Sequence, residues 1–178
     1  MERHEWLTRE LASLPWYAKH LLDALNDKHL SASGKNPAFA AAKYLVEWED
    51  IIPDTDPVFG CVDDLFVVLY GLSELIRFGG REGKLYGEKT LPTGGRIADR
   101  VTEARENFPG FWSYIVQQVG GGFQEIARAL AQDPTLLAPV ASEVRGYIQQ
   151  ASQRRVTPID ARALEMFLTH RSAQRAKR

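Results

Sequence analysis

The sequence predicts an all-α protein, and three observations carry this prediction. Leucines recur at intervals of three and four residues, as in Leu7, Leu11 and Leu14, which is the spacing of one helix face. Stretches rich in Pro and Gly separate the apolar segments and end the predicted helices. No segment shows a sustained two-residue alternation with β-branched residues, so no sheet is expected.

Length and composition favour an intracellular globular protein. The 178 residues suffice for one domain with a real core. The formal net charge of −1 provides no overall field that would attract nucleic acid or acidic membranes. A single cysteine, Cys61, excludes an internal disulfide and fits a reducing compartment. No signal peptide is visible, and the most apolar run, Leu65–Leu72, is too short to span a bilayer. These features predict a cytoplasmic protein.

A helical hairpin is predicted over residues 37–78. Asn36 suits the cap of its first helix and Pro37 the first helical position. The second helix, over residues 65–78, is apolar on almost every side and is therefore expected to be central. Between the two helices, an acidic turn holds residues that interrupt a helix or cap the next one. They are Pro53, Pro57, Gly60, Asp63 and Asp64.

The remaining regions complete a single domain predicted over residues 1–178. A glycine-rich stretch among charged residues predicts a loop over residues 79–96. Residues 97–178 are predicted to be helical, with the glycines of 120–122 separating two helical pieces. Asp133-Pro134 and Thr157-Pro158 each pair a cap with a first-turn proline. The prediction is an orthogonal bundle of about seven or eight helices, built around a hairpin with a rigid acidic Pro/Gly turn.

The turn also carries a pattern of Pro, Gly and Asp residues. Its positions are Asp50, Pro53, Asp54, Pro57, Gly60, Asp63 and Asp64, following Tyr44-Leu45. In this pattern the chain resembles the YkvA-like family, domain of unknown function 1232, over roughly residues 37–78. Trp48 departs from the pattern, because the family usually has proline there. The resemblance implies the helical hairpin and no established activity.

The acidic turn is a candidate metal site. Residues 47–64 hold seven carboxylates and no basic residue, and such a cluster repels itself unless something compensates its charge. Mg²⁺ or Ca²⁺ is one compensator, because these ions bind clustered carboxylate oxygens. The candidate ligands are Asp50, Asp54, Asp63 and Asp64. Helix capping and turn formation also explain these aspartates and are the favoured interpretation. A basic partner surface is a third compensator.

The C-terminal part of the chain is basic. Residues 145–178 hold eight Arg or Lys residues against two acidic residues. The candidate basic surface comprises Arg154, Arg155, Arg171 and Arg175. Contact with nucleic acid or with an anionic membrane is one interpretation, and a solvated helix face is the favoured one. Few aromatic residues interleave with these charges, which argues against nucleic acid and leaves transient membrane contact open.

The sequence carries no signature of a known enzyme class. It lacks the second histidine of a zinc-protease helix, a nucleophile elbow and a phosphate-binding loop. The leading hypothesis is a non-enzymatic adaptor or assembly module that binds a protein partner or forms a homo-oligomer, with the acidic turn docking basic groups. One alternative is a carboxylate site for Mg²⁺ or Ca²⁺ that supports hydrolysis or phosphate chemistry. A further alternative is membrane or nucleic-acid contact through the basic C-terminal helix.

Overall fold

A computed structural model of the chain describes residues 1–47, 51, 59–153 and 155–175. Within these residues the fold is an all-α bundle of nine helices, with one short 3₁₀ helix (η1) and no strand. The helices are α1 (Arg3–Ala12), α2 (Leu14–Asn26), α3 (Ala32–Val46), α4 (Val62–Phe78), α5 (Gly80–Glu88), α6 (Ile97–Asn107), α7 (Pro109–Gln132), η1 (Pro134–Leu136), α8 (Leu137–Ala151) and α9 (Ala161–Arg175). None of the helices in the described ranges is long and apolar enough to cross a membrane.

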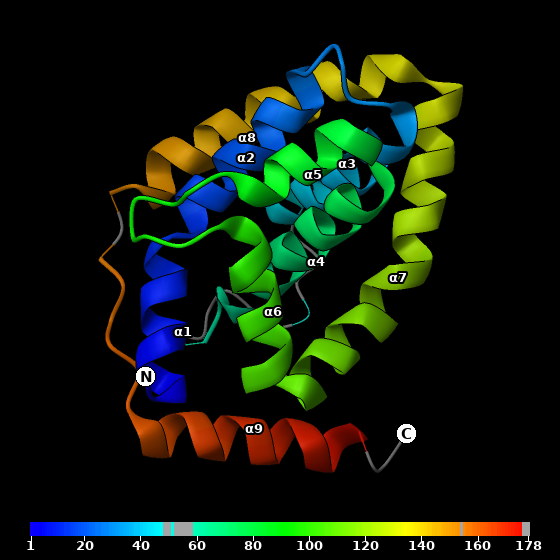
Figure 1. The fold of residues 1–178 in the computed structure, drawn as a ribbon. Coiled ribbons are helices and arrows are strands. Elements are labelled where there is room, and N and C mark those ends of the chain that lie inside the picture. Colours follow the sequence, from blue (N-terminus) through cyan, green and yellow to red (C-terminus); the bar gives the residue numbers. More distant parts are fainter. Residues whose placement is uncertain (48–50, 52–58, 154, 176–178) are drawn as a thin grey trace.

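Helix α4 forms the centre of the bundle (Figure 1). It packs against α3 most extensively and also contacts α1, α2, α5, α6 and α7. Every residue from Val62 to Leu69 is buried, which confirms the prediction that this apolar helix is central. Gly71 allows α3 to approach α4 closely, because a Cβ at this position would collide with the Cβ of Ala41. The two helices of the predicted hairpin therefore pack directly against each other.

The other helices surround this pair. Helix α8 packs against α2 and α3, while α7 contacts α3 and α4, and α6 contacts α4 and α5. The chain then leaves α8, and residues 155–160 run down the side of the molecule past α1 (Figure 1). Helix α9 crosses the end of the bundle, beneath α1 and the start of α7. Helices α1 and α9, which are far apart in the sequence, are thus in contact.

Helix α3 begins five residues earlier than predicted, so Asn36 and Pro37 do not start it. Ser31 is the cap instead, and its Oγ accepts a hydrogen bond from the backbone N–H of Gly34 (3.3 Å). Gly34 also faces α4, where a Cβ would meet the Cα of Gly79 at 2.7 Å. Tertiary packing therefore makes residues 32–36 helical, and Pro37 lies inside the helix.

The predicted loop over residues 79–96 is wrong in its first half, because α5 occupies residues 80–88. Gly80 has a positive φ of 63°, which turns the chain sharply between α4 and α5. Tyr86 is then buried, and its hydroxyl donates to Asp27 at the end of α2 (3.1 Å). This anchor to a distant helix keeps a glycine-rich segment helical. Only residues 89–96 connect α5 to α6.

Two further predicted boundaries are also wrong. The glycines of 120–122 do not interrupt α7, because Val119 and Phe123 on either side are buried and hold one continuous helix. Helix α9 begins after Asp160 and not at Pro158. The Asp160 carboxylate accepts hydrogen bonds from the backbone N–H groups of Arg162 (2.8 Å) and Ala163 (2.9 Å), which is what a cap does.

Candidate functional site

The two described aspartates of the acidic motif lie in the first turn of α4. Cys61 occupies the cap position, so Asp63 and Asp64 do not cap the helix as predicted, and α4 begins three residues earlier than expected. Their side chains are nevertheless buried, with Asp63 fully covered and Asp64 only 5% exposed. Negative charge is favoured at a helix N-terminus, because the helix dipole and the free N–H groups point there. This position explains part of how two adjacent carboxylates are buried.

Tyr44, near the end of α3, holds this turn together through its hydroxyl group. The hydroxyl donates a hydrogen bond to Asp63 Oδ2 (2.7 Å) and accepts one from the backbone N–H of Ile51 (2.9 Å). Burial, and then the negative charge of Asp63, raise the pKa of Tyr44 well above its ordinary value. The phenol therefore keeps its proton and stays a donor. No role for Tyr44 was expected from the sequence, although it opens the motif that resembles the YkvA-like family.

The predicted metal ligands are only partly described. Asp63 and Asp64 are adjacent and buried, whereas Asp50 and Asp54 lie outside the described residues, as do Pro53 and Pro57. Gly60 lies buried in the turn that precedes α4. In the described part of the chain, no three His, Cys, Asp or Glu side chains gather as a metal ion would require. The four-aspartate metal site stays a prediction.

The predicted basic surface is also described only in part. Arg155 is exposed in the segment between α8 and α9, and Arg154 lies outside the described residues. Arg171 and Arg175 lie in the last turns of α9, where the structure describes the backbone alone.

A buried ionic network that was not expected from the sequence joins α1 to α6. Glu10 is fully buried, and its carboxylate accepts hydrogen bonds from the Tyr17 hydroxyl and from Arg9 Nε (2.7 Å). Arg100 Nε lies 3.6 Å from the same carboxylate, and Arg100 Nη1 donates to Glu103 (2.7 Å). Two acidic and two basic side chains therefore balance one another. The available signal was Glu10 itself, which falls on the helix face of Leu7 and Leu14.

Hydrogen bonds stabilise the charged form of Glu103 and the protonated form of Tyr17 in this network. Burial alone would raise the pKa of Glu103, but hydrogen bonds from Trp6 Nε1 (2.7 Å) and Arg100 lower it below its usual value. Burial and the Glu10 carboxylate raise the pKa of Tyr17, so Tyr17 remains protonated and donates. Every charged member thus has a partner of opposite sign, which is the condition for burying charge. We interpret the network as a structural feature that holds α1 against α6.

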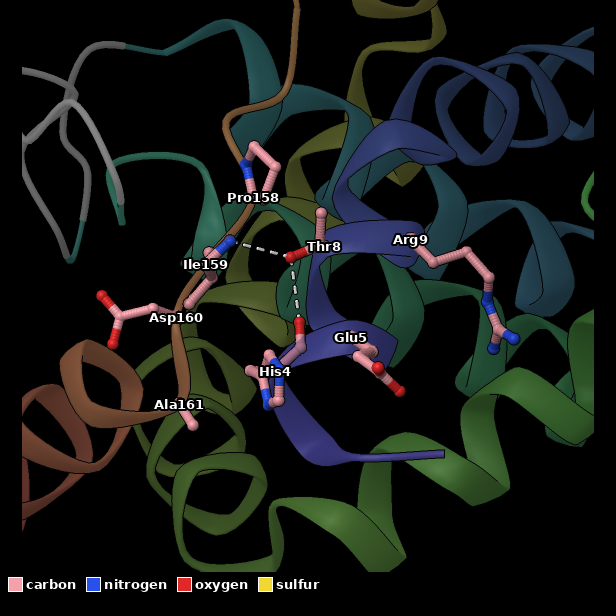
Figure 2. Close-up of a pocket in the computed structure, with 8 residues that line it drawn as sticks. All are labelled: His4, Glu5, Thr8, Arg9, Pro158, Ile159, Asp160 and Ala161. Carbon is pink, nitrogen blue, oxygen red and sulfur yellow. Dashed lines mark hydrogen bonds between the residues drawn. The ribbon is translucent and has the colours of Figure 1, made fainter.

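An open pocket of about 550 Å³ lies between α1 and the residues that lead into α9. Figure 2 shows its lining: His4, Glu5, Thr8, Arg9, Pro158, Ile159, Asp160 and Ala161. Thr8 Oγ1 bridges the two sides, because it donates to the His4 carbonyl (2.9 Å) and accepts from the Ile159 N–H (3.0 Å). The Arg9 and Asp160 side chains point in opposite directions (Figure 2). The charged groups therefore do not converge on one point, as a catalytic constellation would.

The fold class is thus an all-α bundle of nine helices in the described residues, with two buried aspartates in the first turn of its central helix. Comparison with family models, with curated proteins and with solved structures produced no match to this chain.

Proposed function

We propose that this protein is a non-enzymatic helical assembly module, which binds copies of itself or a protein partner through the acidic segment 47–64. The observation that carries the proposal is the engagement of Asp63 by Tyr44 at 2.7 Å. Tyr44 keeps its proton and donates to the buried Asp63 carboxylate. This hydrogen bond closes the turn between α3 and α4. This contact supports a structural role for the described part of the motif.

The shape of the module follows from the same contacts. In this proposal the orthogonal bundle is built around the hairpin of α3 and α4, as the resemblance to the YkvA-like family implies. The Tyr44 hydroxyl ties both ends of the turn, through Asp63 on one side and the Ile51 N–H on the other. The remaining carboxylates of the segment, Glu47 to Asp56, give it a surplus of negative charge that suits basic groups.

The experiment is light scattering after size-exclusion chromatography over a range of protein and salt concentrations. We expect a mass above that of the monomer, which decreases with salt, because exposed charge pairs are screened. The triple variant Glu49→Gln/Asp54→Asn/Asp56→Asn should lower the mass. The matched control neutralises exposed carboxylates elsewhere, in Glu106→Gln/Glu125→Gln/Glu143→Gln. A monomer at every concentration, with no retention on a column of immobilised Arg-rich peptide, would overturn the proposal.

A metal site is the second candidate, favoured by the burial of two adjacent carboxylates, Asp63 and Asp64. Burying such a pair is costly without compensation, and Mg²⁺ or Ca²⁺ would supply it from Asp50, Asp54, Asp63 and Asp64. Thermal unfolding with each ion separates the candidates. A rise in melting temperature that Asp54→Asn/Asp63→Asn abolishes would establish the metal site. Unchanged melting with Mg²⁺, Ca²⁺ and Mn²⁺ would leave the assembly proposal alone.

A further inference from the structure

The first half of α9 packs on the bundle through an apolar face. Its inward residues are Ala163, Leu164, Phe167 and Leu168, which are buried or packed against the core. Exposed residues such as Glu165 and Met166 lie between them. The inward positions recur at intervals of three and four residues, which is the period of one helix face. The register of α9 against the bundle is therefore known from its described side chains.

The same face becomes basic in the last turns of α9. Arg171 and Arg175 follow the buried Leu164 by seven and eleven residues. These intervals are close to two and three full turns at about 3.6 residues per turn, so the backbone places both arginines on the inward side. A cation on the packed side of a helix is costly unless a group of opposite charge compensates it. The end of α9 therefore requires an acidic partner.

The acidic segment 47–64 meets α9 at Phe59. The Phe59 ring stacks on the Phe167 ring with a centroid distance of 4.3 Å and an angle of 11° between the ring planes. Arg171 follows Phe167 by one helical turn, which is about 6 Å along the axis. Asp56 precedes Phe59 by three residues, and three residues of chain span at most about 11 Å. The basic end of α9 and the acidic segment are therefore neighbours within one chain.

We propose that Arg171 and Arg175 pair with carboxylates of the acidic segment 47–64 in the same chain and thereby cover the surface through which the protein assembles. The inference rests on the proposed assembly function and adds its regulation. Charge complementarity selects this occupant, because the segment holds seven carboxylates and no basic residue. Two groups held close in one chain have a high effective concentration. Basic groups of a second copy or of a protein partner therefore compete with α9 for the segment.

The pairing is tested by cross-linking with a carbodiimide, which joins a lysine amine to a carboxylate in contact with it and releases water. Arg171→Lys supplies the amine, and peptide mass spectrometry of the monomer fraction locates the link. We expect a link within one chain between position 171 and residues 47–64. Arg162→Lys is the matched control, because Arg162 is exposed on the outer side of α9, and it should form no such link.

The regulation is tested by light scattering of the full chain carrying Arg171→Gln/Arg175→Gln. Removing the competing charges should raise the association constant severalfold and lengthen retention on the column of immobilised Arg-rich peptide. Arg128→Gln/Arg145→Gln, at two exposed positions elsewhere, should change neither quantity.

Three outcomes separate this inference from the assembly function. Weaker association of Arg171→Gln/Arg175→Gln would overturn the inference, because α9 would then supply the basic groups to another copy. The absence of the link, together with unchanged association, would also overturn it and leave the assembly function standing. A link in a protein that stays monomeric at every concentration would support the pairing and refute the assembly function.

Discussion

At the scale of single residues, the hydroxyl of Tyr44 joins three parts of the chain. Tyr44 lies near the end of α3. Its hydroxyl donates to Asp63 in the first turn of α4 and accepts a hydrogen bond from the backbone N–H of Ile51. Without it, the buried Asp63 carboxylate loses one of its hydrogen bonds. Losing a hydrogen bond at a buried group is costly, because water does not replace the lost donor.

We therefore expect Tyr44→Phe to lower the free energy of unfolding by about 1–3 kcal/mol. Urea denaturation followed by circular dichroism measures the change. The matched control is Tyr114→Phe, at a half-buried tyrosine whose ring contact with Phe111 survives the substitution, and it should stay within about 0.5 kcal/mol. Equal losses for the two variants would contradict the role of the Tyr44 hydroxyl.

His20 makes stability depend on pH. Burial, and then the neighbouring Lys89, lower the pKa of His20 from 6.5 to about 4, while Asp23 opposes the shift. The unfolded chain takes up a proton below pH 6.5 and the folded chain does so only near pH 4, so folding stability falls as the pH decreases through this window. Because His20 is partly open to screening, the loss should be about 1–2 kcal/mol.

The measurement is the urea midpoint at pH 7 and at pH 4.5 for the wild type and His20→Gln. The variant should lose less stability between the two values, because the residue that resists protonation is gone. His29→Gln, at an exposed position, should keep the wild-type dependence. An unchanged pH dependence in His20→Gln would refute the assignment.

At the scale of elements, the glycines of the bundle fall into two physical classes. A Cβ at Gly71 would collide with Ala41, and one at Gly83 would collide with the Leu75 carbonyl. In α7, by contrast, a Cβ at Gly121 or Gly122 would meet nothing within 4 Å. Gly71 and Gly83 therefore permit close packing, whereas Gly121 and Gly122 only weaken the helix.

The same substitution should consequently have opposite effects in the two classes. Gly121→Ala should raise the free energy of unfolding by about 0.5–1 kcal/mol, since Ala is the better helix former. Gly71→Ala should lower it by about 1–3 kcal/mol, because the core is overpacked. Thermal and urea unfolding of both variants test this. Destabilisation by Gly121→Ala would show that α7 needs a glycine there.

At the scale of the whole molecule, the network of Glu10 and Arg100 connects the first helix to α6. Removing one member of a buried ion pair leaves the other uncompensated, so Glu10→Gln should lower the free energy of unfolding by about 3–5 kcal/mol. The exposed pair of Lys19 and Asp23 is the control, and Asp23→Asn should cost below about 1 kcal/mol. Similar small losses at both positions would mean that the network does not hold α1.

Much of this architecture could be predicted from periodicity alone. The helical class and the central position of α4 followed from apolar residues at helical spacing, which is a local property. The start of α3 at Ser31 and the existence of α5 did not follow, because Gly34 and Tyr86 act through contacts with Gly79 and Asp27. Asn36-Pro37 is a typical helix-start signal, but tertiary packing outweighs this local preference and α3 begins earlier in the chain.

The sequence by itself determined that this protein is helical and that an acidic turn precedes an apolar central helix. Only the tertiary structure showed that two of the acidic residues, Asp63 and Asp64, are buried in the first turn of that helix. From the sequence, a cap was the favoured role of Asp63, and a metal ion or a basic partner stayed open as alternatives, because all three need the same carboxylate. The structure adds that Asp63 is buried and accepts a hydrogen bond from Tyr44, which sequence periodicity could not show because the two residues lie on different helices.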